Sequence, residues 1–206
     1  MVRVDFYYGI GSRYSYLAAS QVASIETETG CSIEWHPINS ERLLSLRGSS
    51  PFEGEPVSGQ YDWTYREKDA KRWAALYGIP YVEPRGRIRI DPELLALACT
   101  AAKRLGNAAA YSRQLFAAVF CDDLRVVDEA ECARRADAAG FSTSDFSAEL
   151  ASPQTKIELD RTIGRAIGAG VFGVPTFVVD SELFWGNDRI PLLRRHLSGL
   201  RWVDGA

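Results

Sequence analysis

The chain has few cysteines and histidines, the residues on which zinc sites and disulfide exchange depend. Its four cysteines, Cys31, Cys99, Cys121 and Cys132, are scattered, and no two of them form a Cys-x-x-Cys pair. The two histidines add no ligand pattern to them. Because zinc and dithiol sites need closely spaced thiols or imidazoles, we expect no metal site. Scattered cysteines of this kind are expected to be reduced and buried.

The chain also lacks an excess of one charge and a long apolar run. Its 206 residues include 24 basic and 27 acidic side chains, a formal net charge of −3, with no long run of either sign. This balance favours neither a nucleic-acid partner nor an anionic membrane surface. No apolar stretch approaches the ~20 residues that a membrane-spanning helix needs, and residues 1–5 lead into a predicted strand, not a signal peptide. We therefore expect a cytoplasmic protein of one large or two small domains.

The first residues predict the start of an α/β layer. Residues 2–8 are rich in Val, Phe and Tyr, which predicts a strand. After a glycine-containing turn, apolar residues at helical spacing predict a helix over 14–29, which Gly30 would end. Residues 31–35 predict a second strand. A strand that leads to a helix and then to another strand is typical of α/β folds.

The middle of the chain predicts helices only. Their expected ranges are 40–46, 61–77, 91–105, 107–120 and 128–140. The clearest start is Asp91-Pro92, a capping side chain followed by proline at the first helical position. A Gly-, Ser- and Pro-rich stretch at 48–59 predicts a loop, and no strand is expected in this region. Residues 39–151 are therefore a predicted helical insertion domain between residues 1–38 and 152–206.

The end of the chain returns to an α/β pattern around a proline. Ser152-Pro153 starts a predicted helix that ends near residue 168, followed by strands over 176–179 and 183–185 and a last helix over 191–200. Pro175 precedes the first of these strands, where a residue without a backbone N–H is tolerated. A proline in such a place can be in the cis form, although an ordinary turn before a strand is the simpler interpretation.

The predicted order of elements resembles the thioredoxin-like fold. The order is β-α-β, a helical insertion, then α-β-β-α, with a proline before the third strand. The resemblance implies that this proline lies beside the start of the first helix, where redox members carry Cys-x-x-Cys. Here that place holds Ser12-Arg13-Tyr14-Ser15, whose hydroxyls cannot replace the thiolate that disulfide exchange requires. We therefore expect an α/β protein with a thioredoxin-like, DsbA-like fold, a large all-helical insertion and no dithiol oxidoreductase activity.

More closely, the chain resembles the family of 2-hydroxychromene-2-carboxylate isomerases and kappa-class glutathione transferases. Three stretches carry the resemblance: residues 5–18, residues 71–80 and residues 170–189. The last stretch, which contains GVFGVPTFVVD and ELFWGNDR, follows the family pattern almost residue for residue, and the other two follow it more loosely. The resemblance implies a glutathione-dependent enzyme that acts on a small aromatic or conjugated electrophile and is commonly a homodimer.

The resemblance also implies a glutathione site built from both ends of the chain. Ser12 would hydrogen-bond the glutathione sulfur and favour its thiolate, at a helix N-terminus whose free N–H groups favour negative charge. Val174, just before Pro175, would pair with the cysteinyl backbone like an added strand. Asn187 and Asp188 would hold the γ-glutamyl end, with Asp188 pairing its ammonium group. In the isomerases the thiolate adds to a conjugated double bond, rotation follows and the thiol leaves, whereas in the transferases it stays attached.

Three positions depart from the family pattern. The family's proline after the serine is Arg13 here, a family asparagine falls at Ser49, and a lysine that helps to hold glutathione falls at Ser58. Loss of that lysine removes a charge-assisted contact worth about 1–3 kcal/mol to a ligand carboxylate. Arg13 could replace it, since guanidinium binds carboxylates well, or could bind a different ligand.

Simpler interpretations stand beside these roles. Ser12 is also suited to cap the first helix, and Asp188 to cap the last one. Arg13 could be a solvated surface residue. Tyr61 and Trp63 could line an aromatic substrate pocket, although aromatic residues at a helix start more often pack in a core or an interface.

Several functions therefore stay open, with a glutathione-dependent isomerase as the leading hypothesis. A kappa-class-like glutathione transferase is the near alternative. A non-redox binding protein that kept the fold but not the thiol site is another, favoured by the missing lysine and asparagine. A fourth is an enzyme that uses the same cleft without glutathione, with Arg13 as its carboxylate clamp. Arg189 is expected to pair with Asp188, and both histidines, His36 and His196, are expected to be structural.

Overall fold

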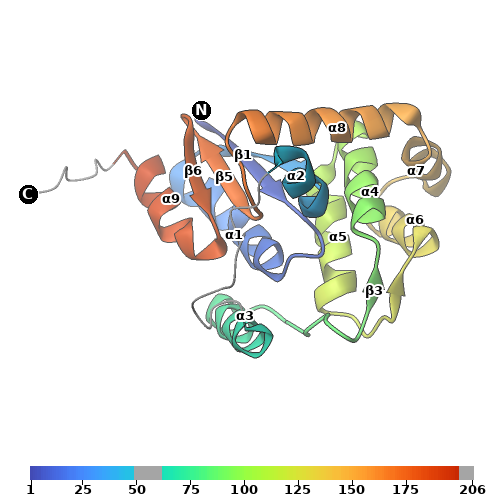
Figure 1. The fold of residues 1–206 in the computed structure, drawn as a ribbon, viewed down its shortest axis with the longest axis horizontal. Coiled ribbons are helices and arrows are strands. Elements are labelled where there is room, and N and C mark those ends of the chain that lie inside the picture. Colours follow the sequence, from blue (N-terminus) through green and yellow to red (C-terminus); the bar gives the residue numbers. More distant parts are fainter. Residues whose placement is uncertain (49–61, 200–206) are drawn as a thin grey trace, which may run out of the picture.

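A four-stranded mixed sheet lies at the centre of the molecule, whose computed structural model describes residues 1–48 and 62–199 (Figure 1). Its strands are β1 (Arg3–Tyr8), β2 (Ser32–Pro37), β5 (Thr176–Val179) and β6 (Glu182–Trp185), in the order β2-β1-β5-β6. The pair β1–β2 is parallel, while β1–β5 and β5–β6 are antiparallel. The sheet therefore joins the two ends of the chain, as the predicted element order requires.

The pleat of β1 sends alternate side chains to the two faces of the sheet. Phe6 and Tyr8 belong to a buried cluster with residues of α1 (Arg13–Thr29) and α9 (Ile190–Leu197). Tyr7 belongs to a second cluster with residues of α2 (Ser40–Arg47) and α8 (Pro153–Gly168). Because successive side chains of a strand point to opposite faces, helices cover both faces of the sheet. Figure 1 shows α8 as a long helix that returns from α7 to the sheet.

The inserted segment is mostly helical. After α2 come α3 (Trp63–Tyr77), α4 (Pro92–Arg104), α5 (Ala108–Phe120), α6 (Glu129–Ala138) and α7 (Thr143–Leu150). The short helix α7 was not predicted, because none of the expected helix ranges covers it. Large side chains of α5, including Phe116, join the same core as Phe6 and Tyr8. The insertion and the sheet therefore share one apolar core, and the division of the chain into two domains stays a prediction.

The prediction that no strand interrupts the insertion is wrong. Strand β3 (Arg89–Ile90) pairs in parallel with β4 (Val126–Val127). Each strand has only two residues, which is too short to show an alternating pattern in the sequence. The pairing joins two segments that lie beyond the ends of α3 and α5, so it depends on tertiary structure and not on local propensity.

The predicted fold class is confirmed by the observed order of elements. The central order is β1-α1-β2 before the insertion and α8-β5-β6-α9 after it, with a one-turn 3-10 helix, η2 (Asn187–Arg189), before α9. This is the predicted thioredoxin-like arrangement with a large helical insertion. Among the described helices, none combines the length and apolar character needed to cross a bilayer.

Candidate functional site

Ser12 lies where β1 passes into α1. Its backbone is extended, and its Oγ accepts a hydrogen bond of 3.2 Å from the N–H of Ser15, so it is the N-cap of α1. The buried Ser15 hydroxyl accepts a hydrogen bond of 3.3 Å from the N–H of Gly9. This bond connects the end of β1 to the first turn of α1. The partly exposed Ser12 hydroxyl thus stands at the positive end of a 17-residue helix. Its capping bond uses the oxygen as acceptor and leaves the hydroxyl proton available to donate.

The loop before β5 lies against this turn. The Val174–Pro175 peptide bond is cis. A Cβ placed on Gly9 would lie 3.6 Å from Val174 Cγ2 and 3.4 Å from the carbonyl oxygen of Ile38, so the two segments are in close contact. Val174 is half-buried, whereas Pro175 is buried. The structure therefore brings the Ser12 turn and the Val174–Pro175 loop together from opposite ends of the chain.

The second half of the predicted site follows β6. Asn187 is buried, and within the described part of the chain its side-chain Nδ2 has no hydrogen-bond partner. Asp188 and Arg189 are half-exposed and form an ion pair of 3.1 Å, which is the pairing expected from the sequence. The N–H of Gly186 donates a bond of 2.9 Å to the carbonyl oxygen of Pro175. This bond ties the Asn187–Asp188 segment to the Val174–Pro175 loop.

A buried amide with no partner costs free energy, so the Asn187 side chain bears on whether a ligand fits. Its Nδ2 is a donor suited to a carboxylate or carbonyl oxygen. Asp188 adds a partly exposed carboxylate one residue away, suited to an ammonium group. Together the two side chains offer a donor and an anion to the two ends of an amino-acid group.

Three predicted residues, Ser49, Ser58 and Tyr61, lie outside the described residues. Trp63, in contrast, is the first residue of α3 and is 46% exposed. Its ring does not pack in a core. The guanidinium carbons of Arg13, Arg66 and Arg85 lie 5.2, 5.0 and 4.7 Å from its centre, within the range of cation–π contacts.

Arg13 is not the solvated surface arginine that one interpretation proposed. Its side chain is 8% exposed, and its Nη2 donates a hydrogen bond of 2.9 Å to Glu83 Oε1. Glu83, Arg66 and Arg85 were not identified from the sequence. Glu83 lies 70 residues from Arg13 along the chain, and no local pattern in the sequence connects them.

Cys99 and Cys132 are buried, and Cys121 is partly buried. Burial raises the pKa of Cys99 to about 12 and that of Cys132 to about 11. Burial also raises the pKa of Cys121, whose Sγ lies 3.3 Å from the hydroxyl of Tyr16. These three thiols are therefore held in the protonated form, which neither binds metals nor exchanges disulfides.

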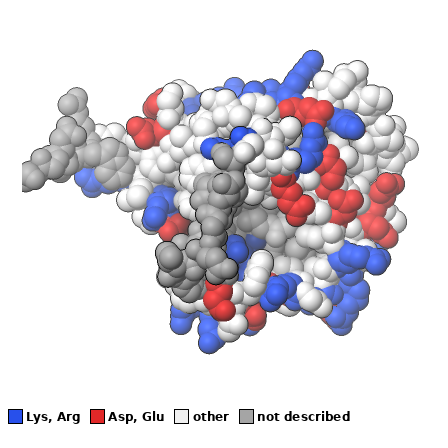
Figure 2. Space-filling model, in the orientation of Figure 1, with Lys and Arg blue, Asp and Glu red and all other residues white. Residues whose placement is uncertain are grey.

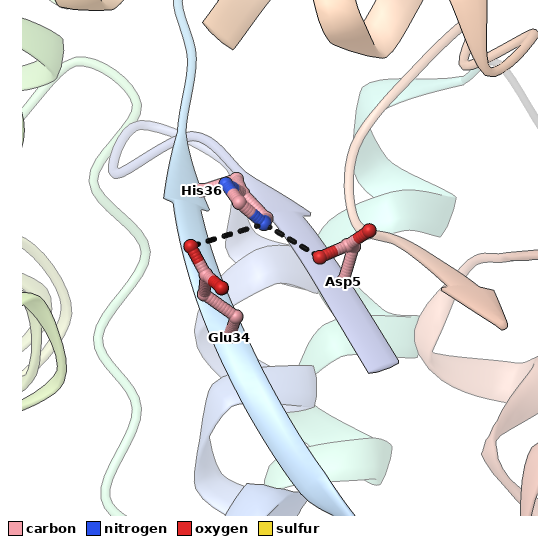
Figure 3. Close-up of side chains that lie close together, drawn as sticks. All are labelled: Asp5, Glu34 and His36. Atoms are coloured by element: carbon pink, nitrogen blue, oxygen red, sulfur yellow. Dashed lines mark hydrogen bonds and ion pairs between the residues drawn. The ribbon is translucent and has the colours of Figure 1, made fainter. Parts of the chain in front are cut away.

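A separate polar cluster joins β1, β2 and α4. Figure 3 shows the His36 ring between the carboxylates of Asp5 and Glu34, with Nε2 2.8 Å from Asp5 Oδ1. On the other side of the ring, the Lys103 ammonium donates to Nδ1 at 2.9 Å and to Glu34 Oε1 at 2.8 Å. An ammonium group cannot accept a hydrogen bond, so the proton of the neutral ring is on Nε2, where it bonds Asp5. Both ring nitrogens are therefore occupied, and the cluster is a charge network and not a set of free metal ligands.

This cluster predicts a pH dependence of stability. Burial and the nearby Lys103 charge lower the pKa of His36 below its ordinary value, against the opposing effect of Asp5. The unfolded chain, with a histidine pKa of about 6.5, therefore binds more protons than the folded one just below that pH. The free energy of unfolding should fall as the pH decreases from 7 to 5. In His36→Gln the amide can donate to Asp5 and accept from Lys103 without titrating, so the fall should be shallower.

Urea unfolding at pH 7 and pH 5 measures this difference, and an NMR titration of the His36 ring measures its pKa in the folded state. Over this pH range the lowered pKa of Glu34 does not interfere, because that carboxylate protonates at lower pH. Equal pH slopes for the two proteins, or a folded-state pKa above 6.5, would contradict the assignment.

The comparisons with known proteins agree with this fold over nearly the whole chain. The family model of the DSBA-like thioredoxin domain matches residues 3–198. The 2-hydroxychromene-2-carboxylate isomerase of Pseudomonas putida is 29% identical over 197 residues, covering 96% of this chain and 95% of that protein. Glutathione S-transferase kappa 1 of Rattus norvegicus is 23% identical and covers 97% of this chain and 92% of its own.

A solved structure gives the same result. The structure of a 2-hydroxychromene-2-carboxylate isomerase matches with a TM-score of 0.81 and 28% identity, covering 96% of this chain and 95% of its own. The resemblance inferred from the sequence is thereby confirmed. Because the family model spans almost all of the sequence and the observed topology agrees with it, the chain belongs to the family of DSBA-like thioredoxin domains.

Proposed function

We propose that the protein is a glutathione-dependent isomerase that acts on an aromatic or conjugated electrophile. The observation that carries the proposal is the Ser12 hydroxyl at the start of α1, in contact through Gly9 with the Val174–Pro175 loop. The full-length similarity to proteins named 2-hydroxychromene-2-carboxylate isomerase supports it. Glutathione, when bound, supplies a thiolate that can add reversibly to a conjugated double bond.

In this proposal Ser12 holds the negative charge of the sulfur. Its hydroxyl proton would donate to the thiolate, and the unpaired N–H groups at the start of α1 would add their partial positive charge. A hydrogen bond to the charged form of a group lowers its pKa, so the thiol would ionise more readily there than in water. The structural fit rests on a hydroxyl that caps the helix and is still partly exposed.

The remaining residues would hold the peptide. Val174 would offer its backbone to the cysteinyl unit, and Pro175, through its bond to Gly186, would fix this loop beside Asn187. The unpartnered Nδ2 of Asn187 would donate to the γ-glutamyl carboxylate, and Asp188 would pair with the ammonium group. Ser49, Ser58 and Tyr61 stay predictions for the same site.

The isomerase proposal is tested by turnover with and without glutathione. Purified protein is mixed with 2-hydroxychromene-2-carboxylate, the products are separated, and their molecular masses are measured by mass spectrometry. An isomer of unchanged mass, formed only when glutathione is present, supports the proposal. A stable glutathione adduct instead supports a kappa-class-like transferase, which the similarity to Glutathione S-transferase kappa 1 favours as the second candidate. The absence of both products over a panel of conjugated electrophiles contradicts an enzyme of either kind.

We expect Asp188→Asn to weaken glutathione binding about tenfold, because one charge-assisted hydrogen bond to the ammonium group is lost. Asp180→Asn is the matched control, since Asp180 is an exposed carboxylate at the β5–β6 turn. Dissociation constants come from the change of tryptophan fluorescence on titration with glutathione. Equal affinities of Asp188→Asn and the wild type for glutathione would show that Asp188 does not contribute to binding.

A further inference from the structure

Arg13 carries a buried N–H group that no residue in the described part of the chain satisfies. It is the first residue of α1 and follows Ser12 directly. One nitrogen of its guanidinium, Nη2, donates to Glu83, while the other, Nη1, is buried and has no hydrogen-bond partner among the described residues. An unpaired buried donor on a charged group is costly unless a ligand or an ordered water supplies an acceptor.

Glu83 does not supply the missing acceptor. Its Oε1 accepts from Arg13 and also from the N–H of Arg85 at 3.1 Å, and its Oε2 accepts from the hydroxyl of Tyr81 at 2.6 Å. Both carboxylate oxygens are therefore engaged, and neither of them bonds Nη1 of Arg13.

Side chains of both charges lie around this group. The three guanidiniums of Arg13, Arg66 and Arg85 lie over one ring, that of Trp63, while Glu83 is the carboxylate that bonds Arg13. Figure 2 shows basic side chains along the lower edge of the molecule, with acidic side chains among them. The carboxylate of Glu67 also interacts with Arg13, so it is the unpartnered Nη1, and not a net positive charge, that favours an anionic ligand here.

We infer that Arg13 forms a carboxylate-binding subsite beside Ser12. A carboxylate provides the planar pair of acceptors that a guanidinium binds best, and Nη1 is the donor it would meet. The carboxylate could belong to the aromatic substrate or to the glycine end of glutathione. This inference deepens the proposed function and rests on it only for the identity of the ligand.

Two pairs of probes distinguish the sources. The first pair is 2-naphthoate and 2-naphthamide, which differ in charge and not in ring size. The second pair is glutathione and its glycyl ethyl ester. Calorimetry on the wild type should show at least one acid bound about tenfold more tightly than its neutral partner, the ratio expected for one charge-assisted hydrogen bond. A preference within the first pair assigns the carboxylate to the substrate, and one within the second assigns it to glutathione.

Variants then show which residue causes the preference for the acid over the neutral probe. Arg13→Gln should abolish it while leaving the neutral probe unchanged, and Arg13→Lys should keep part of it. Glu83→Gln should strengthen binding of the acid, because it frees the guanidinium from a competing carboxylate. Arg161→Gln, at an exposed arginine of α8, should leave all four affinities unchanged.

The outcomes separate this inference from the proposed function. A naphthoate preference that depends on Arg13, in a protein that does not bind glutathione, supports the subsite and contradicts the glutathione proposal. Equal affinity for acid and neutral probes in both pairs overturns the subsite, as does a preference that survives in Arg13→Gln. If Arg13→Gln does not fold, as judged by circular dichroism, Glu83→Gln decides: an unchanged affinity for the acid overturns the inference.

Discussion

Replacing Ser12 by alanine should lower kcat/KM for the proposed glutathione-dependent reaction about 100-fold, the usual effect of losing one preorganised donor to a developing negative charge. The same change should raise the pKa of the bound glutathione thiol by about 1–2 units, since a hydrogen bond to a charged group is worth about 1.5–3 kcal/mol. The pH dependence of kcat/KM and the ultraviolet absorbance of the thiolate measure these two effects.

The competing explanation is that Ser12 only caps α1. Loss of the cap alone would lower the free energy of unfolding by about 1 kcal/mol and leave the thiol pKa unchanged. Ser12→Asp separates the two roles, because aspartate caps helices as well as serine does but offers no proton and repels a thiolate. We expect this variant to be as stable as the wild type and inactive. Near wild-type activity in Ser12→Asp would leave the hydroxyl with a structural role alone.

Replacing Phe6 by alanine should lower the free energy of unfolding by about 3–5 kcal/mol, the range for removing a buried aromatic side chain. Phe6 is fully buried at the centre of the sheet. Its ring stacks on Phe177 of β5 at 4.6 Å and on Tyr8 at 5.2 Å, and meets the edge of Trp35 of β2 at 5.1 Å. One side chain thus links three strands that come from both ends of the chain.

Urea unfolding measures the loss, which is a large share of the 5–15 kcal/mol that typically stabilises a folded protein. Leu192→Ala is the control, because this leucine of α9 is 40% exposed and its loss should change stability by no more than about 0.5 kcal/mol. A cost below about 1 kcal/mol for Phe6→Ala would show that the aromatic stack does not hold the strands together.

Helix starts were predictable from the sequence because capping residues act locally. Ser12, Asp91 and Ser152 each accept a hydrogen bond from a backbone N–H of the helix that follows, as their residue types indicate. The strand after Pro175 also begins where expected, at Thr176. Such features depend on a few neighbouring residues, so the order of the elements before and after the insertion could be derived without tertiary information.

Contacts between distant segments were not predictable in this way. The ion pair of Arg13 with Glu83 and the contact of Lys103 with His36 join residues 70 and 67 positions apart. The short strand β3 was missed for the same reason, yet a Cβ on Gly11 would lie 3.0 Å from Ile90 Cδ1, so β3 touches the turn before Ser12. The insertion therefore contributes to the surroundings of the site through contacts that only the folded chain reveals.

His196 illustrates an intermediate case. The sequence predicted a structural role for it, and its ring does pack against the edge of Phe184 at 5.4 Å. It shares one side of α9 with the buried Leu193, because side chains three or four positions apart lie on the same side of a helix. The partner in β6 could be identified only from the packing of α9 on the sheet.

The central claim is that the Ser12 turn and the Val174–Pro175 loop together bind glutathione, and a calorimetric titration of the wild-type protein tests it most directly. We expect saturable binding of one glutathione per chain at millimolar concentration or below, weakened in Asp188→Asn. No heat of binding up to millimolar glutathione, from protein whose circular dichroism shows it to be folded, would contradict the claim.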